Sequence, residues 1–393
     1  MRLRWALLVA GASLLLVGIA GAKPERPVVL GISWESAGKL AWLDARTLAP
    51  VGRRVDIGRP PIGVAARSPD LRTLALTRGD GRPELRFVDL RAMRETGRLR
   101  VQGTGSLHPG IWRSNDRLVT VRSGTDAELL IVNPLARTVV ERRPLEGQVM
   151  SVTPAVRRLV VLLAQKAAVG PAHLAVVDES GSIRTLLLPR VEAGFTRPTT
   201  EREVGRHVTP GVAVDRSGQR AIVVTPEVLL EIDLEALTIA RTHILARRAL
   251  AAASKAFEGW GRSAIWLSRD AVAVSGSTAT VEGDRVKYAP TGVEIVDVRS
   301  GARRVLDPAA YGAMRVRDVL LTFGGSALRG YDLDGTQRFA LLRGRDTAYV
   351  QTAGRWVYVG RDNSTAFTVV DARAGKVAST ARTPHPTIVL GTR

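Results

Sequence analysis

The chain contains no cysteine. Disulfides, thiolate-bound metals and cysteine nucleophiles are therefore excluded, whichever compartment the protein occupies. Aromatic residues are also scarce, at 5% of the sequence, although hydrophobic residues make up 45% of it. So large an apolar fraction excludes a wholly disordered chain. We expect a sizeable core built mainly from valine, leucine, isoleucine and alanine.

Lysine is the third scarce residue type. Only six of the 57 basic residues are lysine, and the formal net charge is +20. A field of this sign favours anionic partners such as nucleic acid, an acidic polymer or anionic lipid headgroups. The arginines stand singly or in pairs, however, whereas a nucleic-acid site gathers its charge on one face or in one tract. The pattern favours a solvated, arginine-rich surface, and we expect no nucleic-acid partner.

The common catalytic signatures are missing as well. The sequence has no GxSxG nucleophile elbow, no HExxH metal motif and no phosphate-binding loop. We therefore predict no cofactor, and we favour a protein without catalytic activity.

The N-terminal stretch, MRLRWALLVAGASLLLVGIAGA, has the organisation of a secretory signal peptide. Arg2 and Arg4 precede an apolar run over residues 5–19, and the small residues 20–22 form an A-x-A-like cleavage site. We predict that residues 1–22 are a signal peptide and that residues 23–393 are exported to the periplasm, the cell envelope or the medium. The run is about long enough to cross a bilayer if it stayed uncleaved, so an N-terminal membrane anchor is the alternative.

A short phrase recurs along the rest of the chain, as in LAWLDARTLAPV, LAVVDESGSIRT and FTVVDARAGKVA. Alternating apolar residues lead to one polar residue, and a turn and a second β-rich stretch follow. The spacings between these polar residues are 45, 44, 45, 55, 64, 35 and 39 residues. We assign them a structural role, because an Asp carboxylate can accept hydrogen bonds from the backbone of such a turn. The residues are Asp44, Asp89, Asn133, Asp178, Asp233, Asp297, Asp332 and Asp371.

A period in the forties with several short strands per unit is typical of propeller blades. The elements IGRPPIGVAARSPD and VDARAGKV resemble the YVTN-type repeats of secreted β-propellers, in the quinoprotein amine dehydrogenase-like superfamily. That resemblance implies a propeller fold, in a superfamily that includes scaffolds, enzyme subunits, lactonases and lyases. We predict an all-β fold, a single propeller of eight (alternatively seven) four-stranded blades. The N- and C-terminal strands are expected to pair and close the ring.

Two segments interrupt the repeat. Residues 244–258, ILARRALAAASKAFE, are rich in good helix formers and predict a helical insertion. Residues 276–292 are polar with turn signals, and predict an extended hairpin. Insertions of this kind either carry functional loops or only decorate the surface.

Three of the five histidines share a position in the repeat. His108, His207 and His385 each come just before the first strand of a blade, in SLHPG, GRHVTPG and TPHPT. In the propellers that this chain resembles, that connection lies where the central channel opens. Imidazole can ligate zinc or act as a general acid or base. These histidines are therefore the candidate catalytic or metal-binding residues, although no acidic partner has metal-like spacing to them.

These observations favour a secreted or cell-envelope propeller that acts as a monomeric, non-catalytic binding or interaction module. Its partner would be a protein or an anionic envelope component. One alternative is a propeller lyase or lactonase that uses the three histidines. The other is a binder of anionic polymers or membrane surfaces that relies on the excess of arginine.

Overall fold

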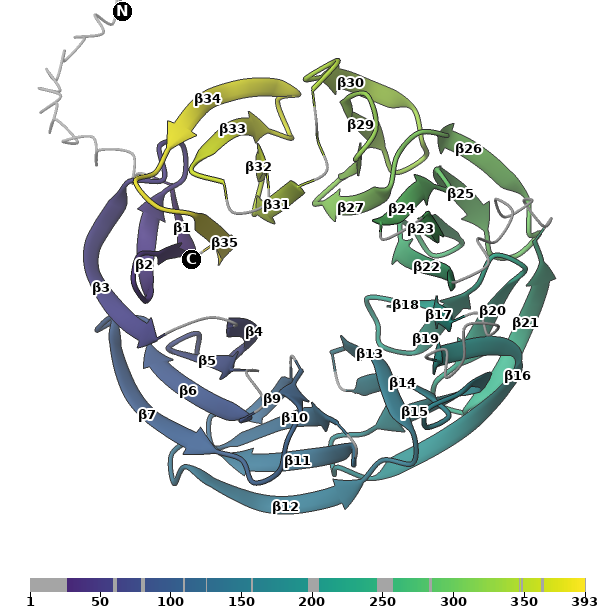
Figure 1. The fold of residues 1–393 in the computed structure, drawn as a ribbon, viewed down its shortest axis with the longest axis horizontal. Helices are drawn as coiled ribbons and strands as arrows, with labels where there is room; N and C mark the ends of the chain where they lie inside the picture. The colour runs from purple at the N-terminus through teal and green to yellow at the C-terminus, as the bar shows by residue number, and fades with distance from the viewer. Residues whose placement is uncertain are drawn as a thin grey trace, which may run out of the picture.

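The computed structural model describes residues 27–392 apart from 59–61, 79–81, 109, 125, 157, 197–204, 246–256, 283–284, 346, 348 and 362–363. Every regular element in this part of the chain is a β-strand. The strands form sheets that are arranged in a ring, with one edge of each sheet near the axis and the other at the rim (Figure 1). This is the arrangement of a β-propeller, as the sequence predicted.

One blade joins the two ends of the chain. It contains β1 (Val28–Trp34), β2 (Gly38–Asp44), β3 (Pro50–Gly58) and β35 (Thr387–Thr392), in the order β3-β2-β1-β35. The antiparallel pair β1–β35 aligns Val29 with Thr392 and Ile32 with Ile388. The predicted closure by the terminal strands is therefore present.

Five further sheets stand as separate blades. The second contains β4 (Ile62–Arg67), β5 (Thr73–Arg78), β6 (Glu84–Asp89) and β7 (Arg94–Arg100). The next contains β8 (Ser106–Leu107), β9 (Ile111–Ser114), β10 (Arg117–Ser123), β11 (Glu128–Asn133) and β12 (Thr138–Pro144). Another contains β18 (Gly211–Val214), β19 (Arg220–Val224), β20 (Val228–Asp233) and β21 (Thr238–Ile244). The last two are simple four-stranded blades. One contains β27 (Gly312–Val316), β28 (Val319–Phe323), β29 (Leu328–Asp332) and β30 (Gln337–Leu341). The other contains β31 (Tyr349–Ala353), β32 (Trp356–Gly360), β33 (Ala366–Asp371) and β34 (Lys376–Arg382).

The seventh sheet has ten strands and differs from a simple blade. Its first part contains β13 (Gln148–Pro154), β14 (Leu159–Ala164), β15 (Val169–Val177), β16 (Ile183–Thr196) and β17 (Gly205–Thr209). Its second part contains β22 (Phe257–Trp266), β23 (Ala271–Glu282), β24 (Arg285–Pro290), β25 (Val293–Asp297) and β26 (Arg303–Asp307). A parallel pair, β17–β22, joins the two parts, so the sheet connects segments on either side of the β18–β21 blade in the sequence.

The predicted blade count is wrong. Six sheets are separate blades of four or five strands, and the remaining strands run together through β17 into one ten-stranded sheet. The prediction took each repeated sequence phrase as one blade. The number of separate sheets also depends on which strands of neighbouring repeats pair with each other, and the phrases carry no information about that pairing.

The predicted helical insertion is wrong as well. Ile244 is the last residue of β21, and Phe257 and Glu258 begin β22. Leu245 is described and belongs to no regular element, residues 246–256 lie outside the described residues, and no helix occurs within the described part of the chain. Within the predicted hairpin, residues 276–292, the far end of β23 pairs antiparallel with β24.

The predicted signal peptide, residues 1–22, also lies outside the described residues. In the part of the chain that is described, no helix has the length and hydrophobicity needed to span a bilayer.

The core is divided among the seams of the ring. Leu30 of the closing blade and Leu74 of the neighbouring β4–β7 blade belong to one buried apolar cluster. On its other side, Tyr358 of β32 is fully buried among residues of both blades, and its hydroxyl donates to the Ala45 carbonyl at 2.8 Å. Buried apolar surface is the main stabilising contribution, so each blade depends on its neighbours.

The recurring polar residues sit at the turns after the third strand of each unit. In seven of the eight, the side-chain oxygen accepts hydrogen bonds from backbone N–H groups two to four residues ahead; in Asp233 these are Glu235 at 2.8 Å and Ala236 at 2.9 Å. Asp332 differs, because its carboxylate pairs with Arg338. These contacts place the repeated carboxylates in turns rather than in a binding site.

Arginine side chains connect neighbouring sheets by donating to backbone carbonyls. Arg113 reaches the carbonyl of Asp178 at 2.7 Å, and Arg315 reaches those of Trp266 and Leu267 at 2.9 Å each. The same kind of contact is made by Arg117, Arg137, Arg143, Arg158, Arg184, Arg220 and Arg304. Part of the arginine excess therefore holds the ring together, which the interpretation as a solvated surface did not foresee.

Candidate functional site

The three candidate histidines lie in three separate parts of the ring. His108 lies between β8 and β9, His207 in β17, and His385 between β34 and β35. Among the described residues, no three His, Cys, Asp or Glu side chains are grouped so that they could hold a metal ion. The structure therefore does not bring the histidines together as one metal centre, and each has to be considered by itself.

His108 has a structural environment. Its backbone N–H donates to the Val121 carbonyl at 2.9 Å, and its own carbonyl accepts from the Thr120 hydroxyl at 2.7 Å. Burial lowers the pKa of the imidazole, and its Nε2 is buried without a hydrogen-bond partner. These backbone contacts and the half-buried ring support a structural role for His108.

His385 contributes its backbone to the described contacts. The hydroxyls of Thr383 and Thr387 donate to its carbonyl at 2.8 and 3.0 Å. These bonds fix the chain just before β35, the strand that closes the ring, so they support a structural role for this segment.

His207 is different, because it is exposed and lines a hollow of about 230 Å³. The hollow lies on the ten-stranded sheet where β17, β22, β23 and β24 run side by side. We call it the His207 groove. The lining residues are His207, Thr209, Gly259, Trp260, Gly261, Ser277, Ala279 and Tyr288.

Strand register explains the shape of the groove. His207 is aligned with Gly259, Gly259 with Ala279, and Ala279 with Tyr288. Aligned residues in neighbouring strands share one face of a sheet. The row therefore runs from a large ring, over two small residues, to a second large ring.

A second row lies beside the first, two residues further along the strands. Thr209 is aligned with Gly261, and Gly261 with Ser277. These small residues complete the floor, and a Cβ atom added to Gly261 would meet no other atom within 4 Å. The space above Gly261 is therefore open to an occupant.

The other face of the same strands belongs to the core. Val208 and Trp260 are aligned and are exposed by only 0% and 9%. Successive side chains of a strand point to opposite faces, so the buried residues anchor the strands while His207 and Thr209 face outward. The groove is thus carried on a sheet whose other face is buried.

The wall at the β17 end is fixed by two contacts of the His207 ring. Phe195 of β16 packs against it edge to face, with ring centroids 5.7 Å apart and an interplanar angle of 86°. The Thr209 hydroxyl lies 3.3 Å from His207 Nε2. Edge-to-face packing is a preferred arrangement of aromatic rings, so the imidazole is positioned before any ligand arrives.

The opposite wall is Tyr288 of β24, whose side chain is 62% exposed. The Tyr311 hydroxyl donates to the Tyr288 carbonyl at 2.9 Å and holds this edge strand in place. An exposed aromatic ring beside a hollow is a common feature of binding sites.

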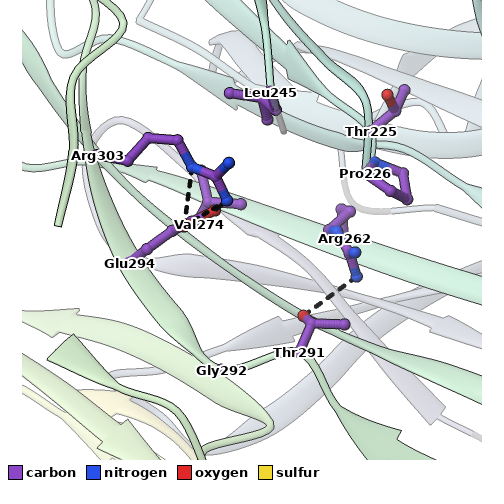
Figure 2. Close-up of a pocket in the computed structure, with 9 residues that line it drawn as sticks. All are labelled: Thr225, Pro226, Leu245, Arg262, Val274, Thr291, Gly292, Glu294 and Arg303. Atoms are coloured by element: carbon purple, nitrogen blue, oxygen red, sulfur yellow. Dashed lines mark hydrogen bonds and ion pairs between the residues drawn. The ribbon is translucent and has the colours of Figure 1, made fainter. Parts of the chain in front are cut away.

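A second, much smaller hollow is closed by polar side chains that pair with one another. It has a volume of about 20 Å³, enough for one water molecule. Arg262 donates to the Thr291 hydroxyl at 3.1 Å, and Arg303 pairs with Glu294 at 2.7 Å (Figure 2). The polar groups satisfy one another, so we interpret this hollow as a seam and not as a binding site.

Two wider hollows lie elsewhere on the ring, of about 550 and 540 Å³. One is lined by Gln148, Lys166 and Phe195, among others, and the second by Arg345 and Arg361. The first has small residues beside a single aromatic side chain, Phe195, and the second has no aromatic side chain. The His207 groove has ring side chains at both ends of its floor, so it is the stronger candidate.

The sequence identified His207 but not the rest of its site. Phe195, Gly261 and Tyr288 belong to no motif. The sequence signal that could have located the site is the length of two repeat units, which are 55 and 64 residues long, whereas the units before them are about 45. The additional residues in these two units form β17, the end of β23 and β24. That these surplus strands pair with one another could not be predicted.

The ring of sheets, closed by pairing of its two ends, defines the chain as a β-propeller. The solved structures agree. The chain is similar to the dihydro-heme d1 dehydrogenase NirN in complex with DHE, with a TM-score of 0.61 and 13% identity over 93% of this chain and 77% of that one. It is also similar to AztD from Citrobacter koseri, with a TM-score of 0.53 and 14% identity over 93% and 98% of the two chains. At such low identity these likenesses show the fold alone. No protein-family model and no curated protein sequence matches the chain.

Proposed function

We propose that the protein is a binding module of the cell envelope, which holds a small ligand reversibly in the His207 groove and does not transform it. The observation that carries the proposal is the pair of aligned rows. The first has ring side chains at both ends of a floor of glycine and alanine, and the second adds a threonine, a glycine and a serine. Pockets for small molecules commonly combine ring side chains with a few placed polar groups.

The chemistry of the lining supports binding over catalysis. Among its described residues only His207 and Tyr288 carry titratable groups, and they stand three strand spacings apart, about 14 Å. General acid–base and nucleophilic catalysis need partners within hydrogen-bond reach of one another. The described partner of His207 is a threonine hydroxyl rather than a carboxylate.

Export is part of the same proposal. The basic and apolar pattern of residues 1–22 supports secretion to the periplasm or cell envelope, in keeping with the resemblance to YVTN-type secreted propellers. There we propose a monomer whose net charge of +20 favours a protein or an anionic envelope component as its neighbour.

A ligand-observed NMR screen of neutral fragments tests the binding function. We expect fragments that bind the wild-type protein, lose binding in Gly261→Val, and are recovered chemically unchanged. The matched control His173→Ala removes a histidine of β15 outside the groove and should bind normally.

Three outcomes would contradict the proposal. They are conversion of a bound fragment, a stoichiometric metal that disappears in His207→Ala, and fragment binding that is indifferent to Gly261→Val. The first two would favour the lyase or lactonase alternative.

A further inference from the structure

We infer that the His207 groove takes a neutral sugar ring, either as a free monosaccharide or as one unit of an envelope glycan. This inference rests on the proposed function and adds the chemical class of the ligand. Size, charge and polar groups each narrow the class.

Size limits the ligand to a single ring. The groove holds about 230 Å³, below the range of roughly 300–1,000 Å³ that is usual for drug-sized ligands. Its walls, His207 and Tyr288, stand about 14 Å apart at the backbone. After the thickness of the two side chains is removed, the remaining width suits one six-membered ring with its substituents.

Charge excludes most ionic ligands. No Asp, Glu, Lys or Arg occurs among the described lining residues. A carboxylate or phosphate would lose its hydration here without gaining a fixed counter-charge. A cationic ligand would also be repelled by the net charge of +20.

The polar groups distinguish a sugar from an apolar ring. Thr209, Ser277 and His207 line the groove with side chains that can form hydrogen bonds, and the Thr209 hydroxyl lies 3.3 Å from His207 Nε2. A hydroxyl can both donate and accept, as can each hydroxyl of a sugar. A purely apolar ring would displace water from the Ser277 hydroxyl and from the remaining hydrogen-bonding positions of Thr209 and His207 without replacing it, which is unfavourable.

The aromatic walls suit the remaining surface of a sugar. A pyranose ring presents C–H groups on its two faces, and the ring of Tyr288 offers apolar surface to them. Glycines in the floor permit close approach of the occupant to the sheet, since no Cβ stands above the backbone at Gly259 or Gly261. The combination of ring walls, small floor and hydroxyl groups therefore points to a sugar.

The test uses the mature protein and three methyl glycosides, of glucose, galactose and N-acetylglucosamine, with phenol and inorganic phosphate as comparators. Binding is measured by saturation-transfer NMR and calorimetry. We expect at least one glycoside to bind more tightly than phenol and phosphate. Gly261→Val should weaken that glycoside at least about tenfold, and Gly261→Ala by less.

The Gly261 series separates binding from folding. The added side chain enters open space and a β-branched residue suits a strand, so the melting temperature should not fall. Tyr288→Ala should weaken binding as well, whereas Leu187→Ala, an exposed residue of β16 outside the groove, should not.

Three other outcomes would contradict either the sugar class or the placement of the ligand in the groove. Failure of every glycoside to bind rejects the sugar class. If phenol binds instead and Gly261→Val abolishes it, the groove remains a ligand site with a different occupant, and the proposed function survives. A glycoside that binds equally to wild type and Gly261→Val binds elsewhere, which overturns the placement.

Discussion

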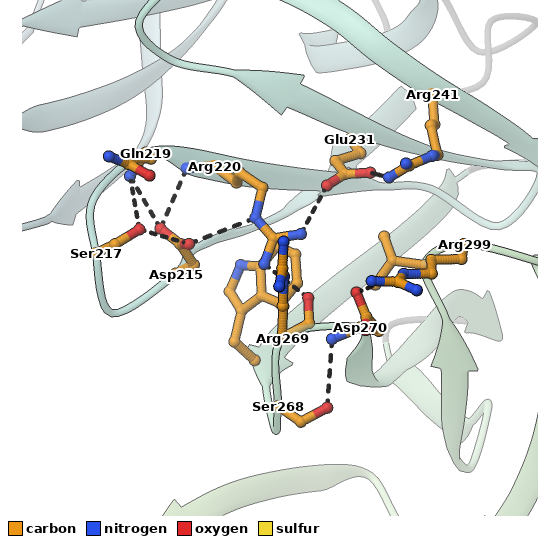
Figure 3. A network of polar contacts seen from close by, with 12 residues as sticks. Asp215, Ser217, Gln219, Arg220, Glu231, Arg241, Ser268, Arg269, Asp270 and Arg299 are labelled. Carbon is orange, nitrogen blue, oxygen red and sulfur yellow. Dashed lines mark hydrogen bonds and ion pairs between the residues drawn. The ribbon is translucent and has the colours of Figure 1, made fainter.

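Glu231 of β20 is a buried carboxylate on which two arginines converge, and its loss should be costly. The side chain is 2% exposed, and its two oxygens accept from Arg220 at 2.9 Å and from Arg241 at 2.5 Å. Arg220 also lies 4.7 Å above the Trp266 ring and donates to the Arg269 carbonyl at 2.6 Å (Figure 3). The carboxylate thus orients a guanidinium that joins the β18–β21 blade to the ten-stranded sheet.

The substitution Glu231→Gln keeps the shape and removes the charge. Removing one partner of a fully buried ion pair costs roughly 3–5 kcal/mol. The arginine side chains here are 26% and 47% exposed, so water compensates them in part. Because the amide oxygen still accepts one hydrogen bond, we expect a loss of about 2 kcal/mol in the free energy of unfolding.

Glu235→Gln is the matched control. Its side chain is 77% exposed and pairs with Arg158 at the surface, so the substitution should cost less than about 1 kcal/mol. Both variants are compared with wild type by urea unfolding. If the dependence of the unfolding free energy on urea concentration is the same for all three proteins, one common slope is used in the fits. The reasoning fails if Glu231→Gln loses no more stability than Glu235→Gln.

Four further predictions concern other parts of the chain. Leu71 has a φ of 59° and is 62% exposed, so Leu71→Gly should stabilise the protein by up to about 1 kcal/mol in thermal unfolding. Asp233→Ala should cost roughly 0.5–1.5 kcal/mol by urea unfolding, because two turn N–H groups lose their acceptor, and ligand binding should not change. Burial lowers the pKa of His108 in the folded protein. As the pH falls, the imidazole is therefore protonated in the unfolded chain, at its unperturbed pKa of about 6.5, before it is protonated in the folded chain. Stability should therefore fall as the pH drops below that value, and His108→Gln should remove this part of the pH profile. Mass spectrometry of the protein from its native host should find Lys23 as the first residue, and retention of Met1 would favour the membrane anchor.

The features that the sequence predicted correctly are those with local causes. A carboxylate such as Asp297 accepts hydrogen bonds from the N–H groups of residues two and three positions ahead. A few consecutive residues therefore determine the turn. Strand alternation around it is equally local. Repetition of this unit was sufficient to predict a propeller and its closure by the terminal strands.

The features that escaped prediction depend on distant partners. β17 and β22 are some fifty residues apart, and neither sequence indicates that they pair in parallel. The start of β22 was assigned to a helix because residues 244–258 contain strong helix formers, but at Phe257 and Glu258 pairing with β17 overrides that preference. The His207 groove follows from the same pairing, so its floor and its second wall were equally hidden.

The three histidines give a similar lesson about repeats. His108, His207 and His385 hold equivalent places in the sequence unit, yet a ring distributes equivalent places around its axis. Equivalence in a repeat therefore predicts a common local structure and not a common site. Only His207 has the neighbours that a binding site needs.

The arginines that join neighbouring sheets have a consequence for acid tolerance. Each of these contacts pairs a guanidinium, which stays protonated up to a pH of about 12, with a peptide carbonyl, which does not titrate in water at ordinary pH. An ion pair weakens when its carboxylate takes up a proton, but the carbonyl contacts of Arg113, Arg184 and Arg315 do not. Acidification should therefore loosen the turns and surface pairs before it breaks these contacts between one blade and the next.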